Sequence, residues 1–90
     1  MTKVFGLSTC SYCKATKRYL DKNNIEYESV FVNKLEGEER EQVVDYIKKL
    51  TGGTMFPVTV SKDEEYVVGF DKKGLQDILH FEEKPRPKLF

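Results

Sequence analysis

Cys10-Ser11-Tyr12-Cys13 contains the only two cysteines of the 90-residue chain and lies near its N-terminus. The residues before it, Lys3–Leu7, form a short apolar run that predicts a buried strand. The residues after it, Lys14–Lys22, predict a helix whose apolar spacing begins at Ser11. A C-x-x-C pair between a strand and a helix is typical of a thiol–disulfide redox site.

The bulk composition narrows the class of protein. A length of 90 residues predicts one small domain, and 15 basic residues balance 15 acidic ones. This balance gives no support for a nucleic-acid or acidic-membrane partner. No apolar run approaches the roughly 20 residues of a membrane helix, and no signal-peptide stretch follows Met1. We therefore expect a cytoplasmic monomer, in which so close a cysteine pair is not a structural disulfide.

The rest of the chain predicts alternating strands and helices. Asn23-Asn24 and Gly52-Gly53 are suited to end the first two helices. The order β-α-β-α-β-β-α predicts an α/β fold with a four-stranded mixed sheet flanked by three helices. Its first two strands should be parallel and its last two should form a hairpin. The further predicted elements are a strand over Ile25–Val32, a helix over Glu38–Leu50, strands over Pro57–Val60 and Glu65–Gly69, and a helix from Asp71 to about Phe81.

Three motifs in this order resemble the glutaredoxin family, which has the thioredoxin fold. Cys10-Ser11-Tyr12-Cys13 is similar to the family's Cys-Pro-Tyr-Cys motif, with serine in place of proline. Thr54–Val58 resembles the segment whose proline is cis in that family, and Val68–Asp71 resembles its Gly-Gly-x-Asp turn. The resemblance implies a glutaredoxin-like domain over residues 1–81 and a C-terminal tail over residues 82–90.

Two segments also resemble the NrdH-type redoxins, which are glutaredoxin-like electron donors to ribonucleotide reductase. These segments are Cys13–Thr16 and Gly69-Phe70. The resemblance implies no permanently bound cofactor, with glutathione or thioredoxin reductase as the electron source. It implies disulfide-containing proteins as partners, among them ribonucleotide reductase.

Cys10 is the candidate nucleophile and Cys13 the candidate resolving thiol. The start of a helix favours an anion, so the pKa of the Cys10 thiol should be lowered. Its thiolate would attack a disulfide, and the more deeply placed Cys13 would resolve the mixed disulfide. Lys14 and Lys17 could add a positive field. We therefore expect a dithiol oxidoreductase that reduces protein disulfides or glutathione mixed disulfides.

The substrate is expected to meet residues of the other two motifs. The resemblance implies a cis Pro57, although trans is the commoner state of an X-Pro bond. The Phe56 backbone would then be free to pair with an extended substrate. Asp71 is a natural N-cap for the last helix. The resemblance adds that Asp71, with Gly69 and Phe70, binds the γ-glutamyl end of glutathione.

Four further side chains are candidates for a role near these motifs or at the end of the last helix. Ser8 and Thr9 could donate hydrogen bonds to the nucleophile. Tyr12 is either an aromatic contact for the substrate or an ordinary surface residue. His80 is interpreted as a residue of the last helical turn, placed favourably beside the C-terminal end of the helix dipole.

Other residues depart from the glutathione-using pattern. Leu7 stands where such proteins commonly carry a lysine, Val68 replaces the first glycine of the turn, and Lys72 replaces its second acidic residue. Lys48 and Lys49 could offer glutathione another carboxylate partner. The sequence thus defines the redox chemistry better than the electron donor.

The sequence also has three alternatives to the enzyme: a cluster carrier, a redox-sensing module and a zinc site. A glutathione-dependent [2Fe–2S] cluster carrier is compatible with Ser11, but such carriers often have one active cysteine. A non-enzymatic redox-sensing module could dock a partner through residues 84–90. Zinc usually takes four ligands, and only His80 and acidic residues would join the cysteines, so no metal site is expected.

Overall fold

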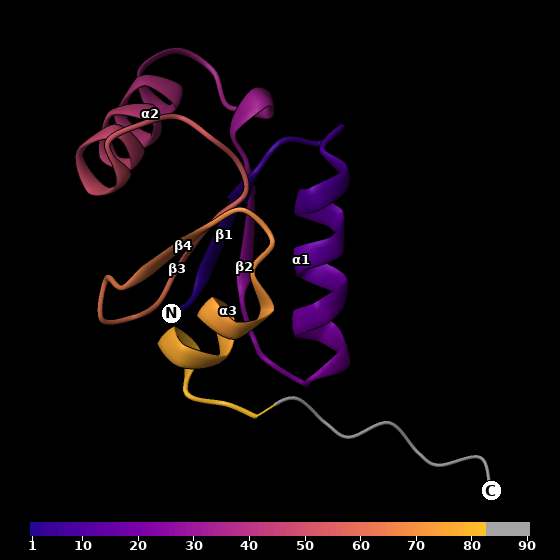
Figure 1. The fold of residues 1–90 in the computed structure, drawn as a ribbon. Coiled ribbons are helices and arrows are strands. Elements are labelled where there is room, and N and C mark those ends of the chain that lie inside the picture. The colour runs from indigo at the N-terminus through magenta and orange to yellow at the C-terminus, as the bar shows by residue number, and fades with distance from the viewer. Residues whose placement is uncertain (83–90) are drawn as a thin grey trace, which may run out of the picture.

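A four-stranded mixed sheet forms the centre of the computed structural model, which describes residues 1–82 (Figure 1). Its strand order is β2-β1-β3-β4. The predicted tail over residues 82–90 lies almost wholly outside the described residues. The elements, in chain order, are β1 (Lys3–Gly6), α1 (Ser11–Lys22), β2 (Glu28–Phe31), the 3₁₀ turn η1 (Val32–Lys34), α2 (Gly37–Thr51), β3 (Val58–Val60), β4 (Tyr66–Val68) and α3 (Lys72–Leu79).

The pairing of the strands confirms the predicted topology. β1 pairs in parallel with β2 and antiparallel with β3, and β3 forms an antiparallel hairpin with β4. The parallel pair is joined through α1, as expected for strands that cannot be linked by a tight turn. This arrangement brings the C-terminal end of β1 beside the N-terminal end of β3.

Helices cover both faces of the sheet, and each face has its own apolar cluster. On one face, α1 and α3 bury Leu20 and Leu75 around Val4 of β1. On the other face, α2 buries Ile47 against Phe5 of β1 and Val58 of β3. Figure 1 shows α2 on one side of the strands and α1 with α3 on the other. Successive side chains of a strand point to opposite faces, so Val4 packs into one apolar cluster and Phe5 into the other.

The ends of the helices follow the residues that predicted them. Asn23 is the C-cap of α1, and Asn24 has a left-handed backbone with a φ of 58°. Gly52 ends α2 in the same region, with a φ of 81°. At the start of α3, Asp71 is the predicted N-cap, and its Oδ1 accepts a hydrogen bond from the Gly74 backbone N–H at 3.1 Å.

Two predicted elements exceed the observed ones by three residues or more. The strand over Ile25–Val32 shrinks to β2 because pairing begins only where Glu28 meets Lys3. Before that point, the N–H of Ile25 donates to the carbonyl of Leu20 instead. The last helix ends at Leu79, not at Phe81. Among the described residues, no helix is long and apolar enough to cross a membrane.

His80 lies at the last turn of α3, as predicted, because its N–H donates to the Gln76 carbonyl. His80 is the C-cap of α3 and has a left-handed backbone with a φ of 56°. The chain turns there because the next residue, Phe81, packs its ring against Tyr19, with 5.9 Å between ring centroids. Packing of Phe81 thus ends the helix where spacing alone would have extended it.

Candidate functional site: a dithiol at one edge of the sheet

One edge of the sheet collects the residues of all three motifs. β1 ends there at Gly6, and residues 7–9 form the loop that leads to Cys10. Pro57 lies at the same edge, because the next residue, Val58, pairs with Phe5. Gly69 lies beside Pro57, whose carbonyl accepts a hydrogen bond from the Gly69 N–H at 2.7 Å. The topology therefore brings together segments that are far apart in the sequence.

Cys10 is the N-cap of α1, and its sulfur caps the helix. Its Sγ accepts a hydrogen bond from the Cys13 backbone N–H at 3.2 Å. The first N–H groups of a helix have no partner within the helix, so a thiolate at this position is stabilised by them. Cys10 is partly exposed, which leaves the sulfur accessible to a substrate.

Cys13 lies on the inner side of the same helical turn. Its side chain is 1% exposed and faces the end of β1. A Cβ added to Gly6 would lie 2.8 Å from the Cys13 Sγ, so only glycine leaves space for this sulfur. Sequence reasoning missed Gly6, although a glycine inside a strand often marks a close approach.

The two thiols have opposite pKa shifts. Partial desolvation raises the pKa of Cys10, but hydrogen bonds from Cys13 and from the Tyr12 backbone outweigh it, so the pKa is lowered overall. Burial, together with the hydrogen bond and negative charge of Cys10, raises the pKa of Cys13 to about 11. As the pH rises, Cys10 should therefore lose its proton before Cys13, and the thiolate is the form that attacks disulfides.

Of the two lysines expected to add a positive field, Lys17 lowers the pKa of Cys13. Against partial desolvation, hydrogen bonds lower the pKa of Cys10. The Lys17 Nζ lies 4.1 Å from the centre of the Phe31 ring and donates to the Ser29 Oγ at 3.3 Å. These contacts hold Lys17 along β2.

Ser8 is held by a residue that sequence reasoning missed. Its N–H donates to the Asn33 Oδ1 at 3.0 Å, and the Asn33 Nδ2 donates to the Ser8 Oγ at 2.8 Å. These bonds tie the cysteine loop to the turn after β2, so Ser8 positions the loop. Thr9 is exposed. Asn33 could have been found from topology, because the C-terminal ends of two parallel strands meet at one edge.

The proline segment beside the dithiol has the expected geometry. The Phe56–Pro57 peptide is cis. Pro57 is buried, while Phe56 is half-buried and packs its ring on the α2 side of the core. Among residues 1–82, the structure gives the Phe56 backbone no hydrogen-bond partner outside the sheet ladders.

The Gly69–Asp71 segment closes the edge on the other side. Gly69 has a φ of 83°, a conformation that favours glycine, and it turns the chain from β4 into α3. The Phe70 ring packs edge-on against Tyr19, with 5.9 Å between centroids. Phe70 is half-buried by this packing. Asp71 is exposed, so its carboxylate can serve the cap and face solvent.

Two large apolar side chains are exposed near the thiols. Tyr12 is 67% exposed and Met55, two residues before Pro57, is 72% exposed. Leu7, by contrast, packs against the core cluster on the α2 side. The position at which a lysine would meet a glutathione carboxylate is thus occupied by a partly buried apolar side chain.

The sheet carries a partly exposed thiol at a helix N-cap and a buried thiol one turn away. Together they define a thioredoxin-like redox domain. Residues 2–67 match the sequence profile described as Glutaredoxin. Glutaredoxin 1 of Rickettsia prowazekii is 34% identical to this chain over 92% of the chain and 78% of its own length. The chain belongs to the glutaredoxin family.

Solved structures support the fold. The glutaredoxin of Methanosarcina mazei superposes with a TM-score of 0.84 and 36% identity, over 89% of this chain and 78% of that one. The Escherichia coli NrdH-redoxin superposes with a TM-score of 0.65, over 93% of this chain and 97% of that one. Its identity of 20% shows a shared fold alone.

Replacing Gly6 with alanine should displace Cys13. The added Cβ would lie 2.8 Å from the Cys13 Sγ and 3.0 Å from its Cβ, so the buried thiol must move. Overpacking of this kind costs about 1–3 kcal/mol, measurable as a lower midpoint of guanidinium denaturation. Gly53→Ala is the matched control, because nothing lies within 4 Å of a Cβ there. Equal stability of the two variants would contradict this account.

Alkylation should distinguish the two thiols. Iodoacetamide reacts with thiolates, so Cys10 should be modified first as the pH rises, and the buried Cys13, whose pKa is raised, only at higher pH. Peptide mass spectrometry over a pH series measures both. In Cys10→Ser the pKa of Cys13 should fall but stay raised, because the hydrogen bond and charge of Cys10 are lost while burial remains. Simultaneous alkylation of both thiols in the reduced protein would exclude the assignment.

Proposed function

We propose that this protein is a dithiol–disulfide oxidoreductase in which Cys10 attacks and Cys13 resolves. The hydrogen bond from the Cys13 N–H to the Cys10 Sγ is the observation that carries the proposal. It stabilises negative charge on the partly exposed sulfur, while the second sulfur is buried and keeps its proton. This asymmetry suits a reaction with one entering and one resolving thiol.

The reaction then has two balanced steps. The Cys10 thiolate attacks one sulfur of the substrate disulfide, forms a mixed disulfide and releases the other substrate sulfur as a thiolate. Cys13 then loses its proton and attacks the Cys10 sulfur, which forms the Cys10–Cys13 disulfide and releases the second substrate thiolate. The substrate gains two electrons and the protein dithiol loses two.

We further propose that the substrates are protein disulfides. The unpaired Phe56 backbone beside Pro57 offers an N–H and a carbonyl to an extended chain. The exposed Tyr12 and Met55 side chains would cover apolar substrate surface on either side of Cys10. Such a reaction suits a reducing compartment such as the cytoplasm, where substrate disulfides are transient.

The electron donor is proposed to be a protein reductase of the thioredoxin reductase type. Leu7 is partly buried against the apolar cluster on the α2 side and gives no charge to a glutathione carboxylate. Val68 lies in β4, where the family turn would have a glycine. Gly69 and Asp71 remain exposed enough for a weak glutathione contact, but a donor protein needs only access to the oxidised dithiol. The parallel with NrdH-type redoxins, and hence with ribonucleotide reductase as a substrate, belongs to this proposal.

Serine variants should separate the two thiol roles. Cys10→Ser should reduce turnover of a protein disulfide such as that of insulin to background, because the nucleophile is lost. Cys13→Ser should still attack but should accumulate a mixed disulfide, visible as a mass adduct that dithiothreitol removes. Turnover by Cys10→Ser, or an adduct on Cys13 in the unmodified protein, would overturn the mechanism.

The donor proposal predicts which reductase consumes NADPH with the oxidised protein. Thioredoxin reductase alone should support NADPH loss, whereas glutathione with glutathione reductase should not. Leu7→Lys places a positive charge at this edge of the sheet. It should raise the rate of reduction by glutathione, because the proposal attributes weak glutathione use to the missing charge. Efficient reduction of the unmodified protein by the glutathione system alone would assign the opposite donor.

A further inference from the structure

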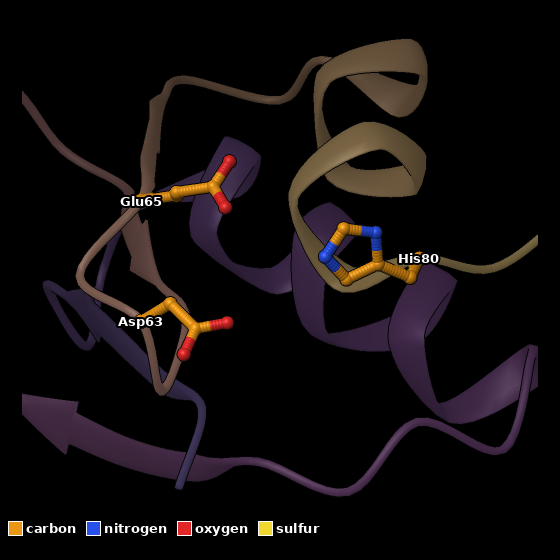
Figure 2. A group of neighbouring side chains, drawn as sticks. All are labelled: Asp63, Glu65 and His80. Carbon is orange, nitrogen blue, oxygen red and sulfur yellow. The ribbon is translucent and has the colours of Figure 1, made fainter.

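A cluster of one imidazole and two carboxylates lies at the edge of the sheet opposite the dithiol. Asp63 and Glu65 belong to the turn between β3 and β4, and His80 caps the end of α3. One donor atom from each of these exposed side chains lies within 4.8 Å of the other two. Figure 2 shows both carboxylates and the imidazole in the space between the turn and the helix end.

The turn holds the two carboxylates on the same side. The Ser61 Oγ accepts hydrogen bonds from the N–H groups of Asp63 and Glu65, each at 3.2 Å. Glu64, between them, has a left-handed backbone with a φ of 62°. Glu64 lines a hollow with Tyr46 of α2, on the opposite face of the sheet. The turn therefore directs Asp63 and Glu65 toward α3 and Glu64 away from it.

The backbone that carries the imidazole is fixed on both sides. The His80 N–H donates to the Gln76 carbonyl, which closes the last turn of α3. The N–H of Phe81 donates to the same carbonyl at 3.2 Å, and its ring packs against Tyr19. His80 is thus held at a defined position between a capped helix and an anchored aromatic residue.

The donor set matches a divalent transition metal. Zn²⁺ binds imidazole nitrogen and carboxylate oxygen at about 2.0–2.2 Å, so two donors on one ion lie no more than about 4.4 Å apart. Short rotations of the exposed side chains bring the observed donors into this range. Imidazole favours zinc and its neighbours, whereas Mg²⁺ and Ca²⁺ prefer oxygen ligands alone.

We propose that Asp63, Glu65 and His80 form a surface site for a divalent transition-metal ion, with Zn²⁺ as the matching ion and water in the remaining positions. The ion would join the β3–β4 turn to the end of α3. No metal site was expected from the sequence, because the ligands come from a turn and a helix end that only the fold brings together. The site is independent of the proposed redox function, since the turn follows Val60, which pairs with Lys3 at the far end of β1.

The single histidine of the chain makes the test specific. In the Cys10→Ser/Cys13→Ser protein, which removes competing thiolates, Zn²⁺ is titrated while the imidazole ¹H–¹³C signals are followed by NMR. We expect a saturable shift with one ion per chain, and no shift with Mg²⁺ at the same concentration. Asp63→Asn/Glu65→Gln should weaken Zn²⁺ binding at least tenfold.

A matched control separates ligation from net charge. Asp77→Asn/Glu82→Gln removes two other exposed carboxylates that lie close to His80 in the sequence. This variant should bind Zn²⁺ with an affinity within twofold of that with the unmodified residues. Equal losses in both double variants, a response to Mg²⁺, or no imidazole shift at millimolar Zn²⁺ would each overturn the proposal.

A second measurement tests the link between the turn and the helix. Zn²⁺ should raise the melting temperature of the Cys10→Ser/Cys13→Ser protein, because an ion bound only by the folded chain stabilises it. His80→Asn should abolish that rise while keeping the fold, since asparagine accepts the left-handed backbone at this position. An equal rise in this variant would show that the ion binds elsewhere.

Discussion

The hydrogen bond from the Cys13 backbone N–H to the Cys10 sulfur connects the fold to the chemistry. It satisfies a group that a helix start leaves unpaired and at the same time stabilises charge on the reactive thiol. The bond depends on α1 beginning at Ser11, and α1 is held there by Leu20 in the core. The activity proposed for the thiol pair therefore rests on the same packing that stabilises the domain.

Much of this arrangement could be predicted from local sequence. Apolar spacing and turn residues gave the element order, and Asn23, Gly52 and Asp71 ended or began helices where expected. Because Cys10 stands at a helix start, the sequence also predicted the direction of its pKa shift, which is downward. These features depend on residues that are close in the chain, and their physics acts over one helical turn.

The features that sequence reasoning missed depend on contacts between distant segments. Gly6 matters only because α1 packs on β1 closely enough to place Cys13 over it. Asn33 supports the cysteine loop because β1 and β2 end side by side. The end of α3 was misplaced because Phe81 packs against Tyr19, a contact that helical spacing does not encode. In each case tertiary packing decided what local pattern left open.

The space that Gly6 leaves for the Cys13 sulfur would also set a direction for the proposed exchange reaction. Displacement at sulfur is collinear, so the entering and leaving sulfurs occupy opposite sides of the atom under attack. Cys13 can approach Cys10 only from the protein interior, because its side chain is 1% exposed. In the proposed reaction, the departing substrate sulfur would then leave on the solvent side of Cys10. The buried position of Cys13 would thus favour substrates that dock with their disulfide on that side.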